Sequence, residues 1–240
     1  MIIYESMIKN LKLIPNGISA KLLLRHSIRP ETSRTDTSFS LGLTREGEEL
    51  AKWLGRYLGG HLDKDFKVDI NKVKTSKSPR CMDTSKMILE GYGKNIPIQE
   101  EKILHSMWIK DEVKWQKLFE YYNNDIKILL QKMLNKEDLD GVYPINLSIA
   151  KMLQVMDFFD TTNIQCNEDS LYMLDIFTTH DSLIMLLLLY LLNKNILEMT
   201  WMYMLEGCIL WFENSILCIA WRGDIYHIEL EYSILREIGL

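Results

Sequence analysis

The sequence contains little cysteine and no long apolar run. Its four cysteines (Cys81, Cys166, Cys208 and Cys218) show none of the short spacings typical of metal sites. The longest apolar run, residues 183–192, is too short for a bilayer span, which needs about 20 residues. No amino-terminal secretory signal is visible, because polar residues interrupt the apolar ones throughout residues 1–20. We therefore expect reduced thiols, a cytoplasmic location and no membrane association.

The sequence also lacks a basic stripe of the kind that binds nucleic acid. Its net charge is −5, but residues 1–94 carry +6 and residues 95–240 carry −11. Six of the eight arginines lie between residues 25 and 80. The acidic remainder would repel a polyanion, so we expect no nucleic-acid partner. The concentration of arginines favours instead a local site for a small anion.

The order of apolar and polar segments predicts alternating strands and helices. At 240 residues and 47% hydrophobic composition, the chain suits a single domain, residues 1–240, with a sizeable core. We expect strands at 21–25, 72–77, 172–178, 208–213, 216–222 and 225–231, and a loop at 31–42. We expect helices from Thr44 to Gly59, from Ser78 to Gly91, and over 182–193. Residues 100–170 read as a mostly helical insertion. The predicted fold is a three-layer α/β/α sandwich around a mixed, mostly parallel sheet.

Polar clusters follow three of the extended segments. Arg25 and His26 end the first apolar strand, and Arg29 follows closely. Ser78-Pro79-Arg80 stands between the second strand and its helix, and His180-Asp181 follows the strand at 172–178. Because ligands in open α/β sheets bind at the carboxyl ends of the strands, these clusters predict a phosphate site.

Four motifs together resemble the histidine phosphatase superfamily, which includes phosphoglycerate mutase-like enzymes and histidine acid phosphatases. Arg25-His26-Ser27-Ile28-Arg29-Pro30 resembles its signature, with Ser27 in place of the usual glycine. Leu43-Thr44-x-x-Gly47 is similar to its next helix start, and Ser78-Pro79-Arg80 with Asp83-Thr84 to its second arginine motif. His180-Asp181 is similar to the pair of the acid phosphatase branch, which we therefore favour.

The resemblance implies a role for each matching residue. His26 would be the nucleophile that becomes phosphorylated, while Arg25, Arg29, Arg80 and His180 would hold the phosphate. Asp181 would donate the proton to the leaving group. The other branch of the superfamily uses a glutamate from a different segment, for which Glu100 and Glu101 are the candidates. The resemblance implies no cofactor and no metal, and the sequence contains no further cluster typical of a metal site.

The function predicted from these residues is hydrolysis of a phosphomonoester through a phosphohistidine, with inorganic phosphate as the product. The substrate is a small molecule or a peptide, and the sequence identifies neither its leaving group nor the oligomeric state. A phosphomutase or phosphotransferase using the same site is one alternative, and a non-catalytic phospho-ligand binding protein is another. We interpret His61, His105 and His227 as ordinary histidines, of which His105 is nearest to the start of the insertion.

Overall fold

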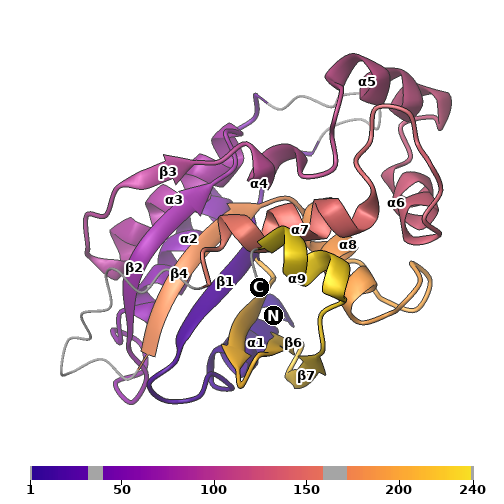
Figure 1. Cartoon of the computed structure of the whole chain (residues 1–240). Helices are drawn as coiled ribbons and strands as arrows, with labels where there is room; N and C mark the ends of the chain where they lie inside the picture. Colours follow the sequence, from indigo (N-terminus) through magenta and orange to yellow (C-terminus); the bar gives the residue numbers. More distant parts are fainter. Residues whose placement is uncertain (1, 32–39, 159–171, 239–240) are drawn as a thin grey trace.

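The computed structural model of the protein describes residues 2–31, 40–158 and 172–238. Figure 1 shows its helices and strands along the chain. The strands are β1 (Ser19–Arg25), β2 (Val68–Thr75), β3 (Ile98–Glu100), β4 (Tyr172–Thr179), β5 (Gly207–Glu213), β6 (Ile216–Trp221) and β7 (Asp224–Ile228). The helices are α1 (Ile2–Leu11), α2 (Arg45–Leu58), α3 (Pro79–Tyr92), α4 (Ile103–Ser106), α5 (Glu112–Tyr121), α6 (Ile126–Leu134), α7 (Ile145–Val155), α8 (Asp181–Leu191) and α9 (Tyr232–Ile238). No helix among these residues is long and apolar enough to cross a bilayer.

The strands of the described residues form one mixed sheet in the order β3-β2-β4-β1-β5-β6-β7. The first four strands in this order run parallel, and β5, β6 and β7 extend the sheet in antiparallel fashion. Arg25 of β1 pairs with Thr179 of β4, and Thr75 of β2 pairs with Thr178, so the three parallel strands end at the same level. The segments that follow them therefore start side by side.

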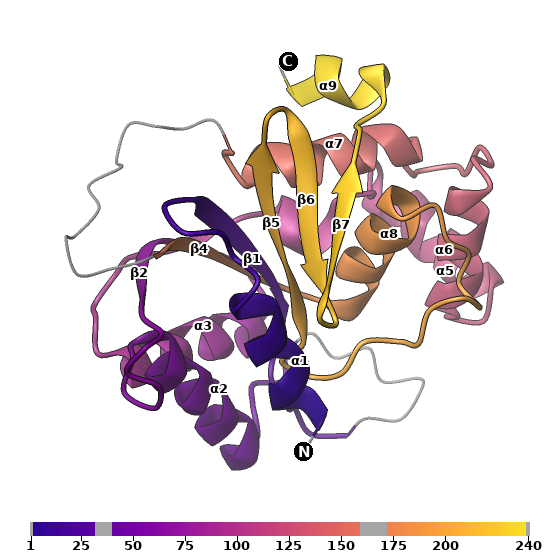
Figure 2. The ribbon, with the colours of Figure 1, turned by 90° about the horizontal axis from the view of Figure 1, so that it is seen from below.

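Helices cover both faces of the sheet. Alternate residues of β1 enter different cores: Leu22 and Leu24 pack on the side of α1, α2 and α3, whereas Leu23 packs on the side of α7 and α8. Figure 2 shows these two helical layers on opposite sides of the strands. The predicted α/β class, with a mixed sheet between helices, is confirmed.

Four helices, α4 to α7, lie between β3 and β4, where the sequence predicts a mostly helical insertion. Asp111 and Asp125 cap α5 and α6 by accepting hydrogen bonds from backbone amides of the first turn. Residues 159–170 of the predicted insertion, and residues 32–39 of the predicted loop, lie outside the described residues. The division of the chain into one domain with an insertion stays a prediction.

Some predicted boundaries are wrong. Helix α3 does not stop at Gly91 but runs to Tyr92 and ends at Gly93, which has a φ of +83°. Gly91 is a packing position, because a Cβ atom there would lie 2.1 Å from the carbonyl oxygen of Lys52 in α2. Strand β2 begins earlier than predicted, at Val68, and the terminal helices α1 and α9 were not predicted. Helix α1 is held by its buried side chains of Met7 and Leu11.

Candidate active site

The carboxyl ends of β1, β2 and β4 bring the predicted polar clusters together. Hydrogen bonds, ion pairs or ring contacts link His26, which follows β1, to residues that follow the other two strands. The cluster comprises Ser76 after β2, Arg80 in the first turn of α3, His180 after β4, and Asp181 as the first residue of α8. Residues that are up to 155 positions apart in the sequence thus form one cluster.

His26 is buried, and its hydrogen bonds fix which ring nitrogen carries the proton. Nδ1 lies 2.8 Å from the carbonyl oxygen of Ser27, which can only accept, so Nδ1 carries the hydrogen. Nε2 accepts a hydrogen bond of 3.1 Å from Nε of Arg80. Burial lowers the pKa of His26 to about 3, and the charges of Arg80 and Arg25 add to the shift. The imidazole is therefore neutral at neutral pH, with its lone pair on Nε2.

Arg80 connects the two histidines. Its Nε donates to Nε2 of His26, and its Nη2 lies 3.3 Å from Nδ1 of His180. The rings of His26 and His180 meet edge to face with their centroids 5.6 Å apart. Burial lowers the pKa of Arg80, and it also holds the pKa of His180 well below its usual value. One guanidinium thus faces two neutral imidazoles.

Arg25 and Asp181 form the ion pair of the cluster. Nη2 of Arg25 lies 2.8 Å from Oδ2 of Asp181, and Nη1 donates to the carbonyl oxygen of Met202 at 2.6 Å. Burial alone would raise the pKa of Asp181. The charge of Arg25, with hydrogen bonds from Nε1 of Trp201 and from the amide of Ser182, outweighs it and lowers this pKa. Asp181 is therefore a carboxylate in the free protein.

Arg29 lies at the more exposed side of the cluster. Its Nη1 donates to the carbonyl oxygen of Pro30 at 3.1 Å. Its charge contributes to the lowered pKa of both Arg25 and Arg80, where burial is the larger cause. The charge of Arg29 therefore acts on both other arginines of the sequence motifs, and its role in holding a phosphate stays a prediction.

Short hydrogen bonds hold the backbone after β1. The hydroxyl of Ser27 donates to the carbonyl oxygen of Gly47 at 2.7 Å, and the amide of Ser27 donates to Oγ1 of Thr84 at 2.9 Å. Gly47 has no room for a side chain, because a Cβ atom would lie 2.2 Å from the carbonyl oxygen of Ile28. Thr44 caps α2 as predicted, accepting from the amide of Gly47. These contacts tie the His26 segment to α2 and α3.

The alternative proton donors lie at the end of β3, beside the end of β2: Glu100 pairs with Thr75, and the amide of Glu101 donates to the carbonyl oxygen of Thr75 at 2.8 Å. The carboxylate of Glu101 is 3.6 Å from Nζ of Lys74, which also contacts Asp157 at 2.8 Å. Glu100 is exposed at the end of β3. Within the described residues, no group of three or more His, Cys, Asp or Glu side chains is arranged to hold a metal. Cys81 is buried beside His180, and burial raises its pKa to about 12.

Comparison with known proteins detects this architecture and no close relative. No protein-family model and no curated protein matches the sequence. YhfR of Bacillus stearothermophilus superposes with a TM-score of 0.59 at 17% identity, over 88% of this chain and 100% of that one. A mycobacterial glucosyl-3-phosphoglycerate phosphatase gives 0.52 at 16% identity, over 80% and 89%. A phosphoserine phosphatase of Entamoeba histolytica gives 0.51 at 14%, over 90% and 98%.

These similar structures include members of the histidine phosphatase superfamily. This chain shares the fold of these structures. At these identities the likeness extends to the fold and does not separate the branches of the superfamily. The assignment to the acid phosphatase branch, and the roles of the individual residues, stay predictions.

Sequence reasoning missed two contacts of this polar cluster. Oγ of Ser76 lies 3.2 Å from Nε2 of His180 and 3.0 Å from Nδ1 of His105, which we had interpreted as an ordinary histidine. Trp201 holds Asp181 from a segment between α8 and β5. Ser76 directly follows β2, so the same strand-end rule predicts its position, whereas Trp201 carries no comparable signal.

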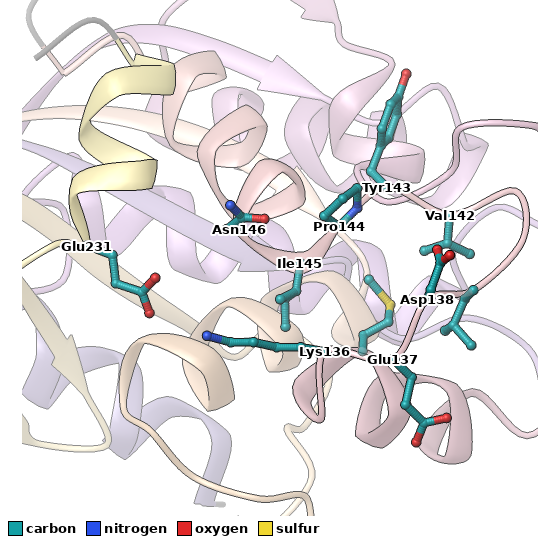
Figure 3. A pocket seen from close by; sticks show the side chains of 11 residues that line it. Lys136, Glu137, Asp138, Val142, Tyr143, Pro144, Ile145, Asn146 and Glu231 are labelled. Atoms are coloured by element: carbon teal, nitrogen blue, oxygen red, sulfur yellow. The ribbon is translucent and has the colours of Figure 1, made fainter.

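A separate hollow lies among the helices, away from the histidine cluster. It has a volume of about 270 Å³ and is bounded by the end of α6, the start of α7 and Glu231. In Figure 3, Lys136 extends toward Glu231, while Ile145 contributes an apolar wall. None of its lining residues belongs to the polar cluster described above.

Proposed function

We propose that the protein is a metal-independent phosphomonoesterase that acts through a phosphohistidine on Nε2 of His26. The observation that carries this proposal is the state of His26, a buried neutral imidazole whose only lone pair faces an arginine. Such a nitrogen is a competent nucleophile without a general base to remove a proton. An arginine beside it can receive the negative charge of the phosphate under attack.

The arginines provide the site for that phosphate. The arginines repel one another electrostatically: the charge of Arg29 lowers the pKa of both Arg25 and Arg80, and the charge of Arg25 lowers that of Arg80. Nε of Arg25 is buried and has no hydrogen-bond partner among the described residues. A buried donor without a hydrogen bond costs free energy, which a bound phosphate oxygen would recover. A phosphoryl group offers three oxygens and spreads its charge over them during transfer. Planar guanidinium groups match this geometry and stay charged.

We assign the proton transfers to Asp181. Nε2 of His26 attacks phosphorus, the bond to the leaving oxygen breaks, and that oxygen takes a proton from Asp181. The resulting carboxylate then accepts a proton from the water that attacks the phosphohistidine, which releases inorganic phosphate and restores His26. In the free protein Arg25 keeps Asp181 ionised. A phosphate that competes for Arg25 would weaken this pair and make Asp181 easier to protonate.

Covalent labelling tests the nucleophile. Brief reaction with a radiolabelled phosphomonoester should leave acid-labile phosphate on the wild-type protein, and His26→Ala should abolish both the label and hydrolysis. His227→Ala is the matched control, because His227 lies exposed on β7. Full activity of the His26→Ala protein, or a label that persists in it, would refute the proposal.

A panel of phosphorylated metabolites addresses the substrate. Phosphoserine and 3-phosphoglycerate are suitable first members, because structures of the similar Entamoeba phosphatase contain them. Added alcohol acceptors separate hydrolysis from the alternatives: a mutase or phosphotransferase would pass the label to the acceptor faster than to water. Phosphate binding without turnover of any panel member would favour the non-catalytic alternative. The free thiols of the described cysteines accord with action in a reducing compartment, for which we propose the cytoplasm.

A further inference from the structure

A chain of hydrogen bonds leads from the histidine cluster to helix α4. Nη2 of Arg80 lies 3.3 Å from Nδ1 of His180, and Nε2 of His180 lies 3.2 Å from Oγ of Ser76. The same Oγ lies 3.0 Å from Nδ1 of His105. Ser76 is fully buried, whereas His105 is half-buried in α4, near the end of β3 in Figure 1. The chain therefore connects the buried site with a less buried imidazole.

The donor and the acceptor of each hydrogen bond in this chain can be assigned by starting at Arg80. A guanidinium only donates, so Nδ1 of His180 accepts and the ring proton lies on Nε2. That proton is donated to Oγ of Ser76, which also accepts from the amide of Ser78 at 3.4 Å. Both lone pairs of Ser76 are then used, so its own hydrogen is donated to Nδ1 of His105. All four hydrogen bonds are compatible with one arrangement of protons.

This arrangement is poorly suited to a bound phosphate. If the phosphate sits between His26 and Arg80, as the proposed function requires, Nδ1 of His180 presents a lone pair to an anion. A hydrogen on Nδ1 would turn the repulsive contact into a hydrogen bond, which is worth more in a buried site than in water. The ring hydrogen of His180 therefore needs to be on Nδ1, and no longer on Nε2, when phosphate enters.

We propose that Ser76 and His105 form a proton relay that lets His180 become a hydrogen-bond donor to the phosphate. The relay rests on the proposed function. A monoanionic phosphate ester, whose second pKa is about 6, transfers its proton to Nδ1 of His180. The Nε2 proton of His180 then moves to Ser76, and the hydroxyl proton of Ser76 moves to Nδ1 of His105. His105 finally releases its Nε2 proton to water, so the ester is left as a dianion and one proton enters the solvent.

Charged groups around the relay favour this outward movement. Those acting on His105 include Lys77, Arg80 and Glu112, and those acting on His180 include Arg80, His26, His105 and Arg25, with Cys81 in contact. Burial lowers the pKa of both histidines, and the nearby cations add to the shift. Neither imidazole therefore retains an extra proton at neutral pH in the free protein. In this scheme His105 is a positioning residue, because it acts through Ser76 and His180.

Proton release on phosphate binding provides the test. Calorimetry of inorganic phosphate binding near pH 6, repeated in buffers of different ionisation enthalpy, counts the protons released. We expect about one proton per phosphate for the wild type and nearly none for Ser76→Ala or His105→Gln. Both variants should also lose about 10-fold to 100-fold in kcat, as loss of an outer-shell partner commonly does. Ser76→Thr, which keeps the hydroxyl, should retain proton release, and so should His227→Gln.

The double variant distinguishes a relay from independent structural effects. Ser76→Ala combined with His105→Gln should be no slower than the slower single variant, because either change alone interrupts the chain. Unchanged proton release in both single variants, or additive losses in the double variant, would overturn the relay. If Ser76→Ala fails to fold, proton release in His105→Gln alone tests the relay. A wild-type protein that binds phosphate with proton release but forms no phosphohistidine would refute the proposed function instead, and one that binds no phosphate would refute both.

Discussion

Strands β1 and β4 contribute to two ion pairs of different kinds. In the middle of the sheet, Nζ of Lys21 lies 2.5 Å from Oδ2 of Asp175, and both side chains are at most 5% exposed. Asn71 donates to the other carboxylate oxygen at 3.4 Å. At the carboxyl end, Arg25 and Asp181 are 2.8 Å apart, but they are 12% and 27% exposed.

The difference lies in the charge that surrounds each pair. Lys21 and Asp175 face each other across the β1–β4 register, and one charge cancels the other. At the carboxyl end, where burial is the larger cause, the charge of Arg29 lowers the pKa of both Arg25 and Arg80 despite Asp181. The first pair has no excess charge and stabilises the fold. The second pair is surrounded by excess positive charge, which an anion can neutralise. An ion pair alone is thus a weak sign of function. An excess of charge of one sign around the pair is more informative.

The largest expected effect follows from breaking the first pair. Lys21→Met would leave the Asp175 carboxylate buried without its cation, so the free energy of unfolding should fall by about 3–5 kcal/mol. Chemical denaturation measures this loss. The double variant Lys21→Met, Asp175→Leu should recover most of it, because it removes both charges. Folded protein of either variant should keep the phosphatase activity that we propose, and a selective loss of kcat would show that the two pairs are coupled.

Arg80→Lys makes the opposite kind of change, since it should affect catalysis and leave stability nearly unchanged. A lysine cannot donate to both His26 and His180 in the planar geometry of Arg80. We expect kcat/KM to fall about 100-fold to 1000-fold, the usual cost of one transition-state donor. Steady-state kinetics and a thermal melt are sufficient measurements. Activity within a few-fold of wild type would contradict the assignment of Arg80 to the phosphate.

Asp181→Asn opens the second pair and tests the proton donor. Hydrolysis of alkyl phosphates should slow about 100-fold, whereas nitrophenyl phosphate, whose leaving group needs little protonation, should be far less affected. Pre-steady-state phosphorylation rates show this selectivity, and inorganic phosphate should bind more tightly because Arg25 loses its partner. Asp175→Asn is the matched control and should show neither effect. Equal loss on both substrates would assign Asp181 a structural role, and selectivity in Glu100→Gln or Glu101→Gln would move the donor there.

The sequence predicted the grouping of the site residues because the rule it used concerns strand ends. Arg25, Arg80 and His180 are far apart along the chain, yet each stands just after or near the end of a parallel strand, and such strands share one edge. The rule locates a residue on the edge without information about loops. Catalytic roles do not follow from position in the same way, and they rest on the experiments above.

Contacts that depend on irregular segments could not be predicted. Trp201 reaches Asp181 only through the path of the chain between α8 and β5, where no periodic pattern fixes the backbone. His105 reaches Ser76 from a helix of one turn. Gly91 was misread because a glycine that allows two helices to approach has the same sequence signature as one that ends a helix.

The last prediction is a pH dependence of stability to which His26 should contribute. His26 has a lower pKa in the folded protein than the ordinary value of 6.5. Between about 3 and 6.5 the unfolded chain therefore binds more protons at this residue, so the free energy of unfolding should fall as the pH is lowered through this window. One such histidine contributes a slope of about 1.4 kcal/mol per pH unit. Denaturation of His26→Gln across this range should show a shallower slope, whereas His227→Gln, on exposed β7, should retain the wild-type slope. An unchanged slope in His26→Gln would mean that folding does not lower the pKa of His26, and the argument for a nucleophile kept neutral by burial would be lost with it.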